Sequence, residues 1–502
     1  RVLYDRKKVW SRLRSLALSG PLAPQFTELG PAEARRRLTL QRMGCSRLRL
    51  LPKETGVRAI ASLSRRERVD FEEEDTGCPE ESGVAPRPRA LVRRYPSAEA
   101  RFLSTNAILR RAFDVLGYEQ RRSPDSFGVG VLGFNEVFPK LCKFLKDLKQ
   151  CRKISRQGTR GGAKSAAPPK LYFVSADIQH CYDNIDQTYL YGLVENLFSE
   201  NDYLIQKATV LHPFDSMGKI QGEATRTVGP PEDFANFPVF ADGTLSQKYS
   251  QSVFVDSAHC SVAKKEELLF LLKEHIFSHV VVAKGRSGPK FLAQSSGIPQ
   301  GSVLSTMLCN YYYGDLEGEL LDGVFLRNTV SCPTPFNRSS SHAYLLTRIV
   351  DDFLLVTTDR DASIRFLGKM NTGIPKLGVA INKAKTRTSF DDDTVGKQAQ
   401  KPLQCDSRGK QFFAWCGMLF DISSCEVRID YSRFSGGLAE DALTVVTCGS
   451  EGSHLLARMK SFIRPRCQPI LYDAVVNQHV VVAHNASQAM LLCAIKTVRY
   501  IE

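Results

Sequence analysis

Two adjacent aspartates stand between two apolar runs in 345-LLTRIVDDFLLVTT-358, and this feature constrains the fold more than any other in the chain. Runs rich in Leu, Ile, Val and Thr predict strands, and the charged pair between them predicts the tip of a β-hairpin. Carboxylates are costly to desolvate beside apolar neighbours, so Asp351 and Asp352 at such a tip favour a bound cation. A solvated Asp-Asp turn is the alternative.

A third carboxylate, Asp177, ends the apolar run 171-LYFVSA-176, which predicts a second strand. A helix is expected in 186-DQTYLYGLVENLF-198, because its apolar residues recur at helical spacing and Asp186 suits the N-cap. Carboxylates on two strands can jointly hold two Mg²⁺ ions, the arrangement used in nucleotidyl transfer. Asp177 therefore weakens the solvated-turn alternative.

The segment 295-SSGIPQGSVLSTMLCNYYYGDLE-317 lies between these two carboxylate motifs. Its glycines, Gly297 and Gly301, allow close backbone approach, and the apolar run after them predicts a helix. A Gly-Pro turn alone is weak evidence. Its place between an Asp-tipped strand and an Asp-Asp hairpin is far more specific.

The first part of the chain predicts a basic hairpin in 46-SRLRLLPKETGVRAIA-61. The strand period of two places Arg47 and Arg49 on one face, with Lys53 at the tip and Arg58 on the return strand. Helices are expected around residues 4–18, from Pro31 and over 263–277.

Composition places the protein among folded, soluble chains of two to four domains, with 502 residues and 43% apolar side chains. The net charge is +15, and residues 1–60 hold 14 Lys and Arg against 4 Asp and Glu, which favours a polyanionic partner. Fourteen cysteines without a C-x-x-C pair, and no long apolar run, indicate a reduced intracellular protein without a membrane role. Loops are expected at 65–89, 152–170 and 330–342.

In this order the motifs resemble those of reverse transcriptases, and closely those of the telomerase catalytic subunits. The blocks that carry the resemblance are 46-SRLRLLPKETGVRAI-60 (fingers), 171-LYFVSADIQHCYDNI-185 (motif A), 297-GIPQGSVLSTMLC-309 (B), 348-RIVDDFLLVTT-358 (C), 378-GVAINKAKTRTSF-390 (D) and 413-FAWCGMLFD-421 (E). The long spacing from Asp177 to Gly297 and the Trp415-Cys416-Gly417 signature favour telomerase over retroelement enzymes. Residues 178–181, Ile-Gln-His-Cys, are unusual for motif A.

The resemblance implies a role for each matching residue. Asp177, Asp351 and Asp352 would be the catalytic triad, which holds two Mg²⁺ ions together with the Ile178 backbone, and Lys385 would be the general acid. The implied nucleotide-binding residues are Lys53, Arg58, Tyr182, Gln300 and Gly301, and the implied primer grip is Trp415, Cys416 and Gly417. A solvated hairpin for Lys53 and Arg58, a core role for Tyr182 and a buried Trp415 without a ligand role are the alternatives. His275 and His279 are expected to be ordinary helix residues, since the order H-E-x-x-H is absent.

The resemblance also implies the architecture, an α+β right-hand polymerase of the reverse transcriptase type with a partial thumb. The expected divisions are 1–30 (end of an RNA-binding region), 31–165 (fingers), 166–200 (palm), 201–285 (an insertion in the fingers), 286–430 (palm) and 431–502 (partial thumb). The sequence would then be a fragment of a longer protein.

The implied activity is extension of telomeric DNA 3′ ends by copying a telomerase RNA template, in the nucleus at chromosome telomeres. The implied partners are telomerase RNA, telomeric single-stranded DNA, deoxynucleoside triphosphates and other holoenzyme proteins, with no membrane. Two rival hypotheses remain, a retroelement-type reverse transcriptase and a catalytically degenerate nucleic-acid-binding protein. The intact carboxylates argue against the second.

Overall fold

The computed structural model describes residues 7–53, 56–65, 103–157, 169–212, 220–234, 237–249, 251–284, 288–325, 343–391, 403–432 and 451–501. The chain divides into two compact units. Unit 1 contains residues 1–5, 127–181 and 313–502, and unit 2 contains residues 6–126 and 182–312. Most of the three predicted loops lies outside the described residues, but the prediction is wrong for residues 152–157, which form the last part of helix α4 (Phe134–Gln157).

The centre of unit 1 is a five-stranded sheet that carries the aspartates. Its strand order is β13 (Arg387–Thr388), β5 (Tyr172–Asp177), β12 (Asp352–Thr357), β11 (Tyr344–Ile349) and β4 (Gly130–Val131). Only the β11–β4 pair is parallel. The predicted hairpin is confirmed: Ile349 pairs with Asp352, which leaves Val350 and Asp351 as a two-residue turn.

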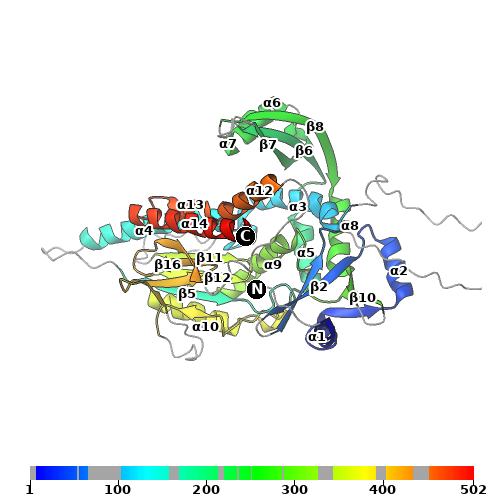
Figure 1. The fold of residues 1–502 in the computed structure, drawn as a ribbon, viewed down its shortest axis with the longest axis horizontal. Coiled ribbons are helices and arrows are strands. Elements are labelled where there is room, and N and C mark those ends of the chain that lie inside the picture. The colour runs from blue at the N-terminus through cyan, green and yellow to red at the C-terminus, as the bar shows by residue number, and fades with distance from the viewer. Residues whose placement is uncertain are drawn as a thin grey trace, which may run out of the picture. The chain divides into compact units, whose positions relative to one another are not determined.

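Helices pack on this sheet because its strands are apolar on both faces. Strand β12, for example, has four consecutive side chains buried from Phe353 to Val356. Helix α10 (Arg360–Thr372) contacts β5 and β12, and Phe366 on α10 packs near Phe353. Helix α4 (Phe134–Gln157) contacts β11 and α13 (Figure 1). The sheet is thus the core layer of unit 1.

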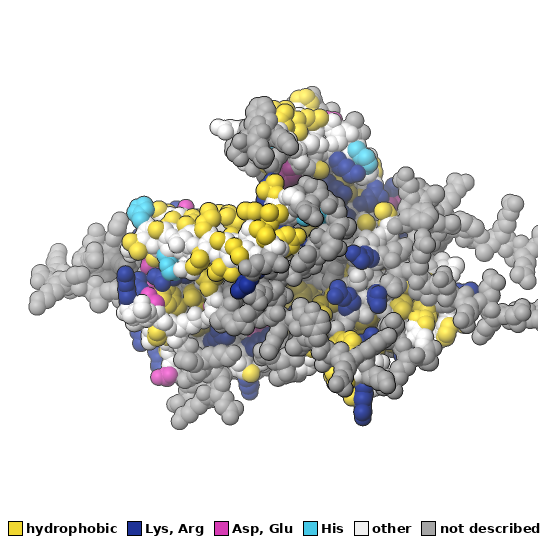
Figure 2. Space-filling view, viewed as in Figure 1, with side chains coloured by type: hydrophobic (Ala, Val, Ile, Leu, Met, Phe, Trp, Pro, Cys, Tyr) yellow, Lys and Arg dark blue, Asp and Glu magenta, His cyan; other side chains and the backbone are white. Residues whose placement is uncertain are grey.

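A second sheet of unit 1 has the order β14 (Gln404–Cys405), β15 (Gln411–Trp415), β16 (Met418–Asp421) and β17 (Val427–Ile429). Helices α12 (Glu451–Ile463), α13 (Pro469–Tyr472) and α14 (His479–Ile501) follow it. One apolar cluster joins both sheets, α4 and α13, and includes Phe144, Phe173, Phe413 and Ile470. Apolar side chains also gather on the surface over α12 and α14, Met459, Val480 and Met490 among them (Figure 2).

Unit 2 has its own five-stranded sheet, in the order β1 (Phe26–Leu29), β10 (Pro289–Gln294), β9 (Val280–Lys284), β2 (Ser46–Lys53) and β3 (Gly56–Ser62). The pair β2–β9 is parallel and the others are antiparallel. The predicted helices appear as α1 (Lys7–Ser19) and α2 (Pro31–Leu40), the latter with proline at its first turn. Unit 2 also contains helices α3 (Thr105–Arg122) and α5 (Gln187–Leu197). The Asp186 side chain caps α5 by accepting a hydrogen bond from the Tyr189 amide.

The region expected as an insertion forms a three-stranded antiparallel sheet in the order β7 (Gln221–Gly229), β6 (Asp202–His212) and β8 (Val253–Lys264). The short helices α6 (Phe237–Phe240) and α7 (Ser246–Lys248) lie between β7 and β8. The helix predicted over 263–277 is confirmed as α8 (Lys265–Phe277). No strand was predicted here from the sequence, because β6 has a bulge between Lys207 and Ala208 that breaks the alternation of side chains.

Helix α9 (Ser305–Leu320) is the helix predicted after the Gly-Ile-Pro-Gln-Gly segment, and its residues fall in both units. His275 lies on α8 and His279 just beyond it; both are buried, with their rings in edge contact. Burial lowers the pKa of His275 to about 3 and that of His279 to about 4, so both stay neutral. No helix among the described residues has the length and apolar character needed to cross a bilayer.

Candidate active site

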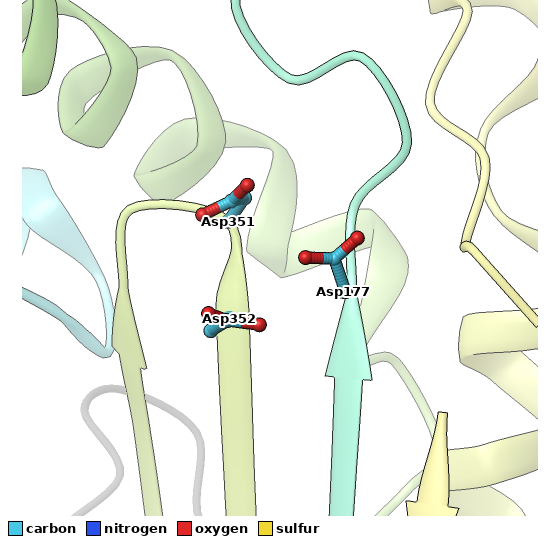
Figure 3. Close-up of side chains that lie close together, drawn as sticks. All are labelled: Asp177, Asp351 and Asp352. Atoms are coloured by element: carbon cyan, nitrogen blue, oxygen red, sulfur yellow. The ribbon is translucent and has the colours of Figure 1, made fainter. Parts of the chain in front are cut away.

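Three carboxylates meet at one end of the central sheet of unit 1 (Figure 3). Asp177 ends β5 and pairs directly with Asp352 at the start of β12, and Asp351 occupies the turn before it. One oxygen from each side chain lies within 4.8 Å of the others. The sequence prediction that these aspartates converge is therefore confirmed, and the strand register explains it.

The carboxylates of Asp177, Asp351 and Asp352 repel each other because they lie close together. Burial, together with the charges of Asp351 and Asp177, raises the pKa of Asp352 to about 7. Asp177 is only 4% exposed. A bound cation would offset this repulsion, so the cluster favours a cation site.

The donor set fits a hard divalent cation. Carboxylate oxygens are the ligands that Mg²⁺ prefers, and Mg²⁺ is held in proteins by one or two carboxylates together with substrate phosphates and water. All three side chains present oxygens to the same small region, and none of them has nitrogen or sulfur to offer. A divalent-metal site is thus supported by the chemistry of the residues.

Lys385 lies at this site, as the sequence predicted. Its ammonium donates to both carboxylate oxygens of Asp177, at 2.9 Å each, while its side chain remains 58% exposed. Burial lowers the pKa of Lys385, but the hydrogen bonds to Asp177 and the neighbouring aspartate charges outweigh it and leave the pKa raised. The lysine is therefore charged and accessible to solvent.

Backbone bonds fix the ends of the strands that carry the aspartates. The Ile178 amide donates to the Asp351 carbonyl at 3.0 Å, which ties the end of β5 to the turn. The Asn382 amide donates to the Asp177 carbonyl at 2.8 Å, which brings the segment of Lys385 alongside. Three sequence motifs are thus joined by main-chain contacts.

A buried arginine that sequence reasoning missed supports the aspartate turn. Arg348 is fully buried, and its Nη1 donates to the Val350 carbonyl at 2.9 Å. Its Nε donates to Glu317 Oε1 at 2.8 Å, and its Nη2 donates to the Phe127 carbonyl. Val350 needs such support, because its φ of +59° is a left-handed conformation that a β-branched residue rarely adopts.

Glu317 extends this support to α9. Its other carboxylate oxygen accepts from the Val129 amide at 2.6 Å, next to strand β4. Burial raises the pKa of Glu317 even though Arg348 lowers it. The signal in the sequence was a charged residue inside an apolar strand, but its partner lies 31 positions away and no local pattern identifies it.

The predicted primer-grip residues lie where β15 turns into β16: Trp415 ends β15, and Cys416 and Gly417 form the turn. Cys416 and Gly417 both have positive φ, +46° and +81°, and Cys416 Sγ donates to Asp352 Oδ2 at 3.5 Å. Trp415 is 3% exposed and packs against Phe134 and Phe420. The structure therefore brings Cys416 to the carboxylates and places Trp415 in the core.

In unit 2, the predicted basic face of the hairpin is confirmed. Arg47 and Arg49 are exposed and alternate with the buried Leu48 and Leu50. Arg58 on β3 is exposed and opposes Leu51, so it shares the face of the two arginines. Lys53 is the last residue of β2 and pairs with Gly56.

The segment 297-GIPQG-301 of unit 2 forms hydrogen bonds with β3 and with the residues that follow Cys181. The Gln300 carbonyl accepts from the Ala61 amide at 2.9 Å, and Gln300 Nε2 donates to Asp183 at 3.0 Å. Gly301 has a φ of +111°, and a Cβ there would collide with the Ala61 carbonyl. The half-buried Tyr182 accepts from the Ile298 amide through its carbonyl. Gln300 and Asp183 line a small pocket with Ala59 and Ala61.

Comparison with known proteins agrees with the resemblance that the motifs carry. No protein-family model matches the chain. Over 98% of its length it is 29% identical to the telomerase reverse transcriptase of Mus musculus and 28% identical to that of Bos taurus, and over 99% it is 26% identical to that of Arabidopsis thaliana. The chain is thus similar in sequence to telomerase reverse transcriptases over nearly its whole length. It spans about 39% of the length of these curated relatives.

Solved structures agree on the fold. A telomerase structure from Candida albicans, described as a complex with a TWJ fragment of telomeric RNA, aligns with a TM-score of 0.58 at 16% identity, covering 99% of this chain and 62% of that one. An apo telomerase structure from Candida tropicalis aligns with a TM-score of 0.52 at 15% identity, covering 98% of this chain and 62% of that one. The predicted α+β fold of the reverse transcriptase type is confirmed.

Proposed function

We propose that the protein is the catalytic part of a telomerase, an RNA-directed DNA polymerase that extends telomeric DNA 3′ ends by copying a telomerase RNA. The observation that carries this proposal is the convergence of Asp177, Asp351 and Asp352 on paired strands. The relatives named telomerase reverse transcriptase support the choice of reaction.

The carboxylates would hold two Mg²⁺ ions, with Asp177 and Asp351 as the main ligands and with Asp352 and the Ile178 backbone as further ligands. When bound, such ions stabilise the attacking and leaving oxygens in nucleotidyl transfer. The protein supplies the rigid part: the register of β5 and β12 fixes two of the carboxylates, and Arg348 holds the turn of the third. Preorganised charge of this kind avoids reorganisation during the reaction.

Lys385 would donate a proton to the departing pyrophosphate. Its raised pKa keeps it protonated, and its exposed side chain can leave Asp177 for a phosphate oxygen. General acids of this type contribute about 10²–10⁴-fold to rate. The lysine would thus pair with Asp177 before nucleotide binding and act on the nucleotide after it.

Other residues would bind the substrates. Lys53 and Arg58 would neutralise the triphosphate, Gln300 and Gly301 would contact the nucleotide and template, and Tyr182 would exclude a 2′-hydroxyl. Trp415, Cys416 and Gly417 would grip the primer end. Cys416 lies against Asp352, and the buried Trp415 would act by fixing the turn.

The proposed partners are a telomerase RNA, telomeric single-stranded DNA, deoxynucleoside triphosphates and other holoenzyme proteins, in the nucleus at chromosome ends. The basic face of the hairpin, with Arg47, Arg49 and Arg58, supports a nucleic-acid partner. The names of the relatives support the telomerase assignment over a retroelement enzyme.

The test is primer extension by the complete protein, reconstituted with its candidate RNA, Mg²⁺ and a telomeric DNA primer. We expect a ladder with a fixed repeat that disappears in Asp351→Ala and persists in Asp391→Ala, a control at an exposed aspartate of unit 1. Extension without a repeat on any RNA would favour the retroelement hypothesis. Good nucleic-acid binding without extension would favour a degenerate polymerase.

A further inference from the structure

The last strand of the second sheet of unit 1, β17, has an unusual edge. Strand β17 pairs with β16 on one side, as Val427 opposes Phe420. On its other side, the Val427 amide donates to Asn477 Oδ1 at 2.7 Å, and the Val427 carbonyl accepts from Asn485 Nδ2 at 2.9 Å. Two side-chain amides thus take the place of a neighbouring strand.

The same two asparagines also bind helix α13. Asn477 Nδ2 donates to the Ile470 carbonyl at 2.8 Å, and Asn485 Nδ2 donates to the Leu471 carbonyl at 2.9 Å. Each asparagine is 1% exposed. Because a buried amide without partners is costly, these bonds fix where the strand sits against the helices, which apolar packing alone would not do.

The contacts continue from β17 to the candidate active site. Strand β16 is one arm of the hairpin whose turn is Cys416–Gly417, and the Asp430 amide after β17 donates to the Gly417 carbonyl at 3.0 Å. Cys416 Sγ in turn donates to Asp352 Oδ2. The position of β17 therefore determines where the turn meets the carboxylates.

We propose that Asn477 and Asn485 are positioning residues that hold the Cys416–Gly417 turn against the catalytic carboxylates. The proposal rests on the proposed function for its effect on extension, because the turn would contact the primer end. The seating of the turn itself can be measured without any activity. Asn485 acts only as a donor to Val427 and Leu471, whereas Asn477 is also an acceptor, so the two can be separated by substitution.

The experiment compares Asn485→Asp and Asn477→Asp in the complete protein. Asn485→Asp replaces both donated bonds by repulsion between the carboxylate and two carbonyls, while Asn477→Asp keeps the acceptor for the Val427 amide. Ser487→Asp is the matched control, since it adds the same charge at an exposed position of α14. Thermal unfolding identifies the folded fraction of each variant.

The first readout is the rate at which iodoacetamide labels Cys416, followed by peptide mass spectrometry, with the exposed Cys405 as internal reference. We expect labelling of Cys416 to rise at least fivefold in Asn485→Asp, less in Asn477→Asp and not in Ser487→Asp. Unchanged labelling in folded Asn485→Asp would overturn the proposal, even if extension were lost. If Asn485→Asp does not fold, Asn477→Asp decides the question by the same criterion.

The second readout is steady-state extension. We expect the KM for the primer to rise at least fivefold in Asn485→Asp, with the KM for the nucleotide nearly unchanged. A fall in rate in proportion to the folded fraction, with both KM values unchanged, would show a merely structural role and overturn the proposal. If the parent protein itself does not extend primers, the proposed function fails, and the labelling experiment still decides the positioning role.

Discussion

Two hairpins of unit 1 end in two-residue turns that meet at Asp352, yet they are held in different ways. The β11–β12 turn, Val350–Asp351, depends on a fully buried arginine paired with a buried glutamate. The β15–β16 turn, Cys416–Gly417, accepts a neutral hydrogen bond from the Asp430 amide, and Lys410, 45% exposed, pairs with the buried Asp421 only at the open end of that hairpin. The comparison teaches that the turn that carries Asp351 is supported by a buried ion pair, and the turn beside it by a hydrogen bond between neutral main-chain groups.

The largest expected effect comes from removing the buried cation. Arg348→Met leaves Glu317 buried without its partner, which costs about 3–5 kcal/mol of the free energy of unfolding, and it frees the Val350 carbonyl. We expect extension to be lost. Lys410→Met, at the open end of the other hairpin, should cost less, because the lysine is 45% exposed and the buried Asp421 still accepts two hydrogen bonds from Ser423. Urea denaturation of both variants, with Arg408→Met as an exposed control, measures the difference.

A double variant sharpens this result. Arg348→Met with Glu317→Leu removes both buried charges, and we expect it to recover much of the stability lost in Arg348→Met. Extension should stay low, because nothing then binds the Val350 carbonyl. Equal costs for Arg348→Met and Lys410→Met would contradict the distinction between the two hairpins.

A smaller effect is expected from the backbone of the first turn. Val350→Asn places a residue that tolerates positive φ where a β-branched residue now stands, and we expect a gain of about 1 kcal/mol in the free energy of unfolding. Ile349→Asn, one residue earlier in the strand, is the control and should destabilise. A loss of stability in Val350→Asn would mean that the turn depends on the valine side chain.

The smallest effect is a difference in pH dependence. Burial raises the pKa of Glu317, so the folded state holds its proton more tightly, and its contribution to stability falls as pH rises through the folded-state pKa. Burial also raises the pKa of Asp421 on β16, but Ser423 and Lys410 outweigh it, so the pKa is lowered. Its contribution is present above about pH 4 and is lost as pH falls through the folded-state pKa.

Acidification should therefore loosen residues 411–421 before residues 344–357. Hydrogen exchange of the two segments, corrected for the intrinsic effect of pH, measures this order. Asp421→Asn should remove the pH dependence of residues 411–421, and Glu317→Gln should reduce that of residues 344–357, where Asp352 with its raised pKa also titrates. Parallel loosening of both segments would be the contrary result.

The sequence predicted the parts of this site that follow from local pattern and motif order. Asp177, Asp351 and Asp352 could be placed on strand ends because the apolar runs beside them are unambiguous, and Lys385 followed from the family resemblance. The basic face of the β2–β3 hairpin followed from the strand period of two. These features need only short-range information.

The supporting groups could not be predicted, because they depend on long-range contacts. Glu317 reaches Arg348 from a helix, and Asn477 reaches Val427 across 50 positions. Nothing in the residues around either side chain identifies its partner. The sheet of β6, β7 and β8 was also missed, since Val253, Val255 and Val262 are exposed and blur the pattern by which buried strands are recognised.

The pairing of β5 with β12 has a consequence for how such a chain can change over time. Because Asp177 and Asp352 are direct partners in the register, the distance between them does not depend on the length of chain that joins them. Insertions between the two strands leave the pair intact. Loss of one residue within β5 would instead turn its side chains to the opposite face and separate the carboxylates. Natural variation should therefore add or remove whole segments between these strands and leave the strand lengths constant.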